Sequence, residues 1–138
     1  MNAYTLAWGH DERDPSGQHT VAVRTIAELD DALDRLAADG AVRLIDVYEG
    51  RWAEGEPEPP YGFQLVWGHP ERAALTWLGG DSAIAVDPSL PHWPEVIRDD
   101  QDESSPRYTR IAPRQARAAV RQYVQTGRRP TNVLWEQR

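Results

Sequence analysis

The sequence predicts an α+β fold: a mostly antiparallel sheet of about six or seven strands with two helices packed on one face. Three observations support this class. Short segments alternate apolar and polar side chains, turn-length connections dominate the middle of the chain, and two longer segments show helical spacing. At 138 residues the chain suits one two-layer core and is too short for two, so residues 1–138 are expected to form a single domain.

The chain opens with two expected strands, residues 3–8 and 19–24, joined by a polar turn. A helix is predicted for residues 25–39. Thr25 can cap its first turn while Glu28 reaches back from three positions later, which is the capping-box pattern. Gly40 is suited to end this helix.

The predicted first helix has one apolar and one acidic side. Its apolar residues follow helical spacing: Ile26, Leu29, Leu33, Leu36 and Ala37. The remaining side carries Glu28, Asp30, Asp31, Asp34 and Asp39. Asp31 can pair with Arg35 four residues later. We interpret these carboxylates as a solvated helix face rather than a specific site.

The middle of the chain predicts a further strand and a three-stranded meander. The strand is residues 42–49, and a polar loop rich in Gly, Pro and Glu follows it. The meander comprises residues 63–67, 73–77 and 83–86. Turns are expected at Gly68-His69-Pro70-Glu71 and at Gly79-Gly80-Asp81-Ser82. Pro70 cannot donate to a strand ladder, so a turn position suits it.

The second predicted helix is residues 113–126, with Pro113 in its first turn and Gly127 at its end. Its apolar face is expected to consist of Ala116, Ala119, Val120, Tyr123 and Val124. An Arg stripe lies away from that face, at Arg114, Arg117 and Arg121. Residues 133–135 are expected to add an edge strand.

Charge is distributed unevenly along the chain. All 15 basic residues are Arg, and the net charge is −7. Residues 1–106 hold 21 acidic and 7 basic residues, whereas residues 107–138 hold 1 acidic and 8 basic. A net-negative chain is poorly suited to neutralising phosphates, so nucleic acid is not expected as a partner. A basic protein partner fits better, because opposite fields steer encounter.

The sequence offers no catalytic or metal-binding motif. Cysteine is absent, and the four histidines (His10, His19, His69 and His92) show no metal-ligand spacing. Nucleophile elbows and glycine-rich phosphate loops are also absent. We therefore expect no enzyme activity, no metal and no cofactor. Neither a membrane span nor a signal peptide is visible, so a cytoplasmic protein is expected.

Most of the chain resembles the first-numbered immunity-protein family of bacterial polymorphic toxin systems. The resemblance lies in GHPERAALTWLGGDSAIAVDPSLP, TRIAPRQARAAVRQYVQTGRRPTNVLWE and TVAVRTIAELDDALDRLAADG. The matching features are Trp8-Gly9, the turn at Gly68-His69-Pro70 with Trp77, and the Arg-rich helix leading into Gly127-Arg128-Arg129-Pro130 and Trp135. The chain departs from the pattern at Ser82, where a second Gly often follows the Asp, and in the longer acidic run after Ile97.

The resemblance implies a small antidote that binds and occludes a cognate toxin, often a nucleic-acid deaminase. Such a toxin must present a basic channel to its substrate, where carboxylates would compete with phosphates. Two other classes stay open. One is an enzyme or small-molecule binder that uses a Trp-rich sheet face, which would need a concave pocket with converging polar groups. The other is a structural subunit of a larger assembly.

Two loops combine acidic residues with an aromatic anchor and are the predicted partner-binding residues. One loop contains Trp52, Glu54, Glu56 and Glu58, and the other contains Trp93, Asp99, Asp100, Asp102 and Glu103. Trp is enriched among the residues that dominate interface energies, while rim charges mainly set the association rate. The alternatives are that both loops only solubilise the chain, or that the Arg stripe faces the partner.

His69 is interpreted as a turn residue whose ring packs on a neighbour, and not as a catalytic base. We therefore expect His69→Ala to leave toxin neutralisation intact, as measured by growth rescue of cells that express the toxin. A folded His69→Ala protein that fails to neutralise would restore the idea of an active site.

Overall fold

The computed structural model describes residues 2–51, 62–98 and 103–138. Its elements in chain order are β1 (Tyr4–Trp8), β2 (His19–Val23), α1 (Ile26–Ala38), β3 (Arg43–Glu49), β4 (Phe63–Trp67), β5 (Ala74–Trp77), β6 (Ala83–Val86), β7 (Ile97–Arg98), β8 (Glu103–Ser104), α2 (Pro113–Thr126) and β9 (Leu134–Gln137).

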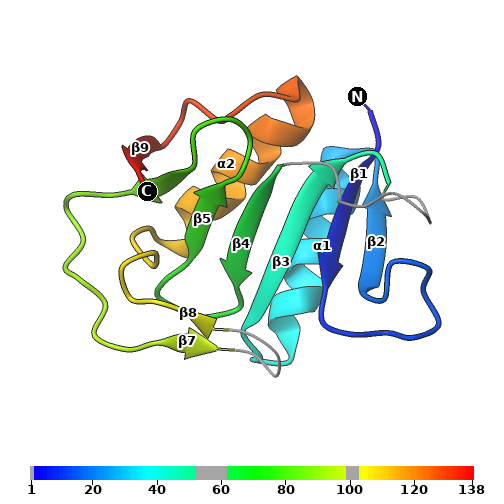
Figure 1. Cartoon of the computed structure of the whole chain (residues 1–138), viewed down its shortest axis with the longest axis horizontal. Helices are drawn as coiled ribbons and strands as arrows, with labels where there is room; N and C mark the ends of the chain where they lie inside the picture. The colour runs from blue at the N-terminus through cyan, green and yellow to red at the C-terminus, as the bar shows by residue number, and fades with distance from the viewer. Residues whose placement is uncertain (1, 52–61, 99–102) are drawn as a thin grey trace.

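A seven-stranded antiparallel sheet forms one layer of the protein, with strand order β2-β1-β3-β4-β5-β6-β9. Both helices lie on the same side of this sheet, with α1 behind β1 and β3 and α2 behind β5 (Figure 1). The predicted α+β class is therefore confirmed. The predicted end strand is also present: β9 pairs with β6 and forms one edge of the sheet.

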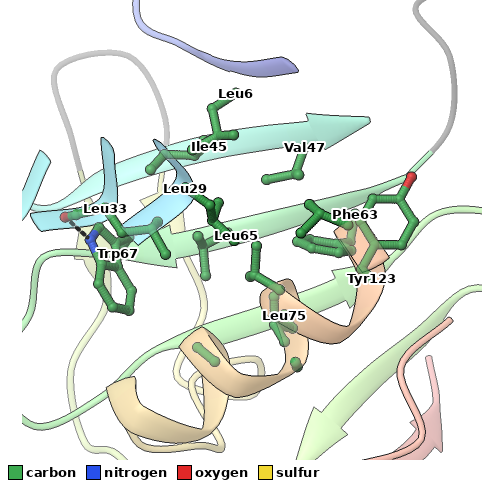
Figure 2. Close-up of a cluster of buried hydrophobic side chains, with 14 of the residues drawn as sticks. Leu6, Leu29, Leu33, Ile45, Val47, Phe63, Leu65, Trp67, Leu75 and Tyr123 are labelled. Atoms are coloured by element: carbon green, nitrogen blue, oxygen red, sulfur yellow. Dashed lines mark hydrogen bonds between the residues drawn. The ribbon is translucent and has the colours of Figure 1, made fainter. Parts of the chain in front are cut away.

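The core lies between the sheet and the helices. Ile45 of β3 pairs in register with Leu65 of β4, and Leu65 pairs with Leu75 of β5, so these side chains share one face. All three are completely buried. They join Leu29 from α1 and Tyr123 from α2 in one cluster (Figure 2). Burial raises the pKa of the Tyr123 phenol to about 12, so this group stays neutral.

The helix ends follow the expected capping chemistry. The Thr25 hydroxyl accepts a hydrogen bond from the Glu28 amide at 3.1 Å and donates to the Glu28 carboxylate at 3.2 Å. Gly127 ends α2 with a φ of 69°, a conformation that favours glycine. At the start of α2, the Gln115 side chain accepts from the Ala112 amide at 2.7 Å. Within the described residues, neither helix is long and apolar enough to cross a membrane.

Glycine is required where the chain leaves β4. Gly68 has a φ of 112°, and a Cβ atom there would lie 2.2 Å from the Ala41 carbonyl oxygen. A larger residue would therefore be strained by both backbone conformation and space. This close approach to the α1–β3 connection fixes the position of the β4–β5 turn, which carries His69.

The other face of the sheet is partly covered by the segment between β6 and α2. Leu44, Val66 and Ala74 form a second buried cluster there with Ile97 of β7. The β7–β8 pair was not predicted from the sequence, which indicated an exposed acidic loop in this region. Strands of two residues are too short to show a period of alternation, so the sequence carries no signal for them.

Trp77 packs between the sheet and α2 and provides a test of this core. Its ring centroid lies 5.8 Å from that of Tyr123 and 6.5 Å from that of Trp135. Trp77→Ala should lower the free energy of unfolding by about 3–5 kcal/mol. Because Trp77 is half-buried, we expect the lower end of this range. The measurement is urea unfolding followed by circular dichroism, with Trp77→Phe as the milder control. A loss below about 1 kcal/mol would contradict this packing.

Candidate partner-binding surface

The structure describes two of the nine predicted partner-binding residues, Trp93 and Glu103. The others lie outside the described residues: Trp52, Glu54, Glu56, Glu58, Asp99, Asp100 and Asp102. Trp93 packs against the same buried cluster as Ile97 of β7. Glu103 begins β8, whose Ser104 pairs with Ile97. Both described residues therefore belong to the layer that covers the second face of the sheet.

The Trp93 ring is held by two side chains of the β4–β5 turn. It meets the His69 ring edge to face, with 4.8 Å between the two ring centroids. The Arg72 guanidinium carbon lies 5.3 Å from the centroid of the Trp93 ring. Trp93 remains partly exposed. A ring that is already ordered loses little conformational freedom on binding, so Trp93 is suited to act as a rigid anchor.

His69 organises the turn beneath Trp93. Its Nδ1 atom accepts hydrogen bonds from the amides of Glu71 and Arg72, at 3.1 and 3.2 Å. Because Nδ1 is the acceptor, the neutral ring carries its proton on Nε2. The interpretation of His69 as a turn residue whose ring packs on a neighbour is confirmed.

Arg72 is a charged residue that the sequence did not single out. The whole residue is only 6% exposed, and its guanidinium donates to the Thr109 carbonyl oxygen at 3.4 Å. A buried cation needs compensating partners, and here the Trp93 ring face and the Thr109 carbonyl supply them. Arg72 therefore ties the β4–β5 turn to the segment that carries Trp93.

Glu103 sits on the β7–β8 hairpin opposite Arg98. The Arg98 Nη2 and Glu103 Oε2 atoms are 3.6 Å apart, and the two side chains are 68% and 63% exposed. An ion pair this exposed contributes little to stability.

Stacking of Arg on aromatic rings is unusually frequent in this protein. Five such contacts occur in the described residues, against about two expected for a chain of this length. The absence of Lys explains part of this, because a guanidinium stacks better than an ammonium group. Arg107 and Arg138 both lie within 6 Å of the Tyr108 ring.

The acidic face of α1 is only partly a solvated surface, which corrects the sequence-based interpretation. Asp30 accepts hydrogen bonds from Arg117 and Arg121 of α2, and Asp34 accepts from Arg117 at 2.6 Å. These bonds join the two helices across the surface. Two of the three members of the Arg stripe, Arg117 and Arg121, are likewise paired within the protein. Arg114 alone forms no ion pair with the described residues.

Asp30 is the electrostatic centre of this helix–helix contact. Hydrogen bonds from Arg121, and secondarily from Arg117, lower the pKa of the Asp30 carboxyl group. The Asp30 carboxylate in turn raises the pKa of Arg121. By contrast, the Asp31–Arg35 pair expected from the sequence is present at 3.0 Å and lies largely in solvent.

Within the described residues, no group of three His, Asp or Glu side chains is arranged to hold a metal ion. Trp67, Trp77 and Trp135 pack in or against the main core cluster. Trp8 also packs against this cluster, so four of the six Trp residues contribute to the two-layer packing.

Comparison with known proteins identifies the class. Residues 17–137 match the family described as Immunity protein Imm1. The match covers most of the chain, and the protein belongs to this immunity-protein family. No curated protein and no solved structure matches it.

The Asp30 contact predicts a dependence of stability on pH. A carboxyl group with a lowered folded-state pKa stabilises the protein above its unfolded pKa of about 3.9, and this contribution is lost as the pH falls through the folded value. Asp30→Asn should therefore cost about 1–2 kcal/mol near neutral pH and flatten the loss of stability in acid.

Denaturant unfolding between pH 2.5 and 7 measures this effect. Asp31→Asn is the matched control, because it removes one carboxylate from the same helix at a largely exposed pair. The control should change stability by less than about 0.5 kcal/mol. Equal effects of the two substitutions would contradict the assigned role of Asp30.

Proposed function

We propose that this protein binds a cognate toxin domain, a nucleic-acid deaminase, and neutralises it by occluding the active site. The observation that carries the proposal is the family match over residues 17–137, because membership of an immunity-protein family implies a toxin protein as partner. The identity of the toxin and the mode of inhibition are the parts that we add.

The charge of the chain supports a toxin with a basic substrate channel. The net charge is −7, and the acidic residues concentrate before residue 107. A deaminase that acts on nucleic acid must attract phosphates to a positive surface. Carboxylates of the two acidic loops can compete for that surface. Opposite fields also accelerate encounter, which favours rapid capture of a newly made toxin.

The described part of the second loop supplies the structural basis for an anchor. Trp93 is contacted by His69 and Arg72 and remains partly exposed. Aromatic anchors of this kind concentrate binding energy, while the surrounding charges set the rate and its salt dependence. We assign Trp93 the anchor role and Glu103, with the acidic residues before it, the steering role.

We propose further that the protein is not an enzyme. The alternative of a small-molecule site on a Trp-rich sheet face loses support, because Trp67, Trp77 and Trp135 are used in core packing. A cleft of about 420 Å³ does lie between β2 and α1, beside Trp8 and Leu36. It is lined mainly by apolar side chains, with Glu28, Asp31 and Arg35 at its polar positions.

Growth rescue tests the proposed function directly. The toxin domain encoded beside this chain's gene is expressed in a bacterial host with and without the protein. We expect growth to be restored, and the purified proteins to form a complex that has lost deaminase activity. Absence of both rescue and complex formation would contradict the proposal. A complex with a toxin that is not a deaminase would contradict the proposed identity of the toxin.

Neutralising each acidic loop tests the assigned surface. Replacing Glu54, Glu56 and Glu58 by Gln, or Asp99, Asp100, Asp102 and Glu103 by Asn or Gln, should lower the association rate by about tenfold at low salt. The effect should shrink at high salt because screening weakens steering.

Glu12→Gln serves as the control, since its side chain is 88% exposed and lies outside both loops. Association with the toxin is followed by surface plasmon resonance at two salt concentrations. If both loop variants associate at the wild-type rate at both salt concentrations, the acidic loops are not the steering surface.

A further inference from the structure

A groove whose charged side chains are both basic borders the β4–β5 turn. It has a volume of about 710 Å³ and is formed by the end of α1, the end of β4 with its turn, and the first turns of α2. Trp67, Pro70 and Pro113 contribute apolar lining, and the charged lining consists of Arg114 and Arg117. No Asp or Glu side chain lines the groove among the described residues.

The two Arg residues of the groove differ in their partners. Arg117 stacks over the Trp67 ring, 5.3 Å from its centroid, and bonds to Asp30 and Asp34. Its charge is therefore compensated within the protein. Arg114 is exposed and forms no ion pair with the described residues. Its charge lowers the pKa of Asp87, but less than the hydrogen bonds from Ser89 and Gln115 do.

Three carbonyl oxygens in the second half of α1 are occupied by hydrogen-bond donors from outside the regular helix pattern. The Leu33 oxygen accepts from the Trp67 indole at 2.8 Å (Figure 2), and the Leu36 oxygen accepts from Arg43 at 2.6 Å. The Ala37 oxygen accepts from the Gly40 amide at 3.2 Å. Of the two Arg residues that line the groove, Arg114 is the one that forms no ion pair with the described residues.

We propose that this groove receives an acidic segment of the toxin, with an Asp or Glu side chain paired to Arg114. Charge complementarity selects the occupant: a guanidinium with no ion pair among the described residues, beside apolar lining, suits a carboxylate on a polypeptide, whose backbone can lie against Trp67 and the two prolines. His69 also lines the groove, but its ring is engaged by the turn and by Trp93.

This inference rests on the proposed function and deepens it. A partner met by acidic loops on one surface and by Arg114 on another is held in a single orientation, because reversing it would place like charges together. The groove would therefore contribute specificity for the cognate toxin in addition to affinity.

Crosslinking identifies the occupant because the chain contains no Lys. Arg114→Lys keeps the positive charge and introduces the only side-chain amine of the protein. A zero-length carbodiimide reagent should then join position 114 to an Asp or Glu of the bound toxin, as located by mass spectrometry. Arg128→Lys is the matched control, since Arg128 is exposed beyond the opposite end of α2. It should give no such adduct.

Charge reversal supplies the second measurement. Arg114→Glu should weaken toxin binding about tenfold, whereas Arg128→Glu should change it less than about twofold. If the wild-type chain binds toxin but positions 114 and 128 behave alike in both measurements, the groove inference is wrong and the proposed function stands. If the wild-type chain binds no toxin, both fail. The inference is also overturned if the Arg114→Lys protein forms no crosslink to the toxin and the wild-type protein binds a single-stranded oligonucleotide through Arg114.

Discussion

Trp67 is the point at which the sheet and both helices are fixed to one another. Its buried indole donates a hydrogen bond to the Leu33 carbonyl of α1, and Arg117 of α2 stacks on its ring. Arg117 then bonds to Asp30 and Asp34 of α1. Four different interactions (apolar packing, a buried hydrogen bond, a cation–π contact and ion pairs) therefore set one relative placement of β4, α1 and α2.

That placement determines which surfaces are left for a partner. The helices occupy one face of the sheet, and the segment with Trp93 covers part of the other (Figure 1). The β4–β5 turn lies between these regions, with Gly68 and His69 holding its shape. It supports Trp93 on one side and contributes to the basic groove at Arg114 on the other. One turn thus supports both of the surfaces that we propose for recognition.

The sequence was sufficient for features that depend on local patterns. Strand alternation, the Thr25 cap and the Gly127 stop each involve residues close together in the chain. Contacts between distant segments had no such signal. The Asp30–Arg121 pair joins residues 91 positions apart, and Arg72 reaches Thr109 over 37 positions. The acidic face of α1 was therefore interpreted as solvated, although Asp30 and Asp34 bond to Arg residues of α2. For the predicted site, the sequence could mark Trp93 as an anchor but could not reveal the residues that hold it.

Hydrogen exchange of the protein with and without bound toxin tests the central claim, that a rigid two-layer scaffold presents its loops and the α2 start to the toxin. The account predicts slower amide exchange on binding in residues 52–61, 92–103 and 112–116. Amides in the middle of α1 should exchange at unchanged rates, since their bonds do not change. Protection confined to α1 and the β2 edge, with those three segments unaffected, would contradict the account.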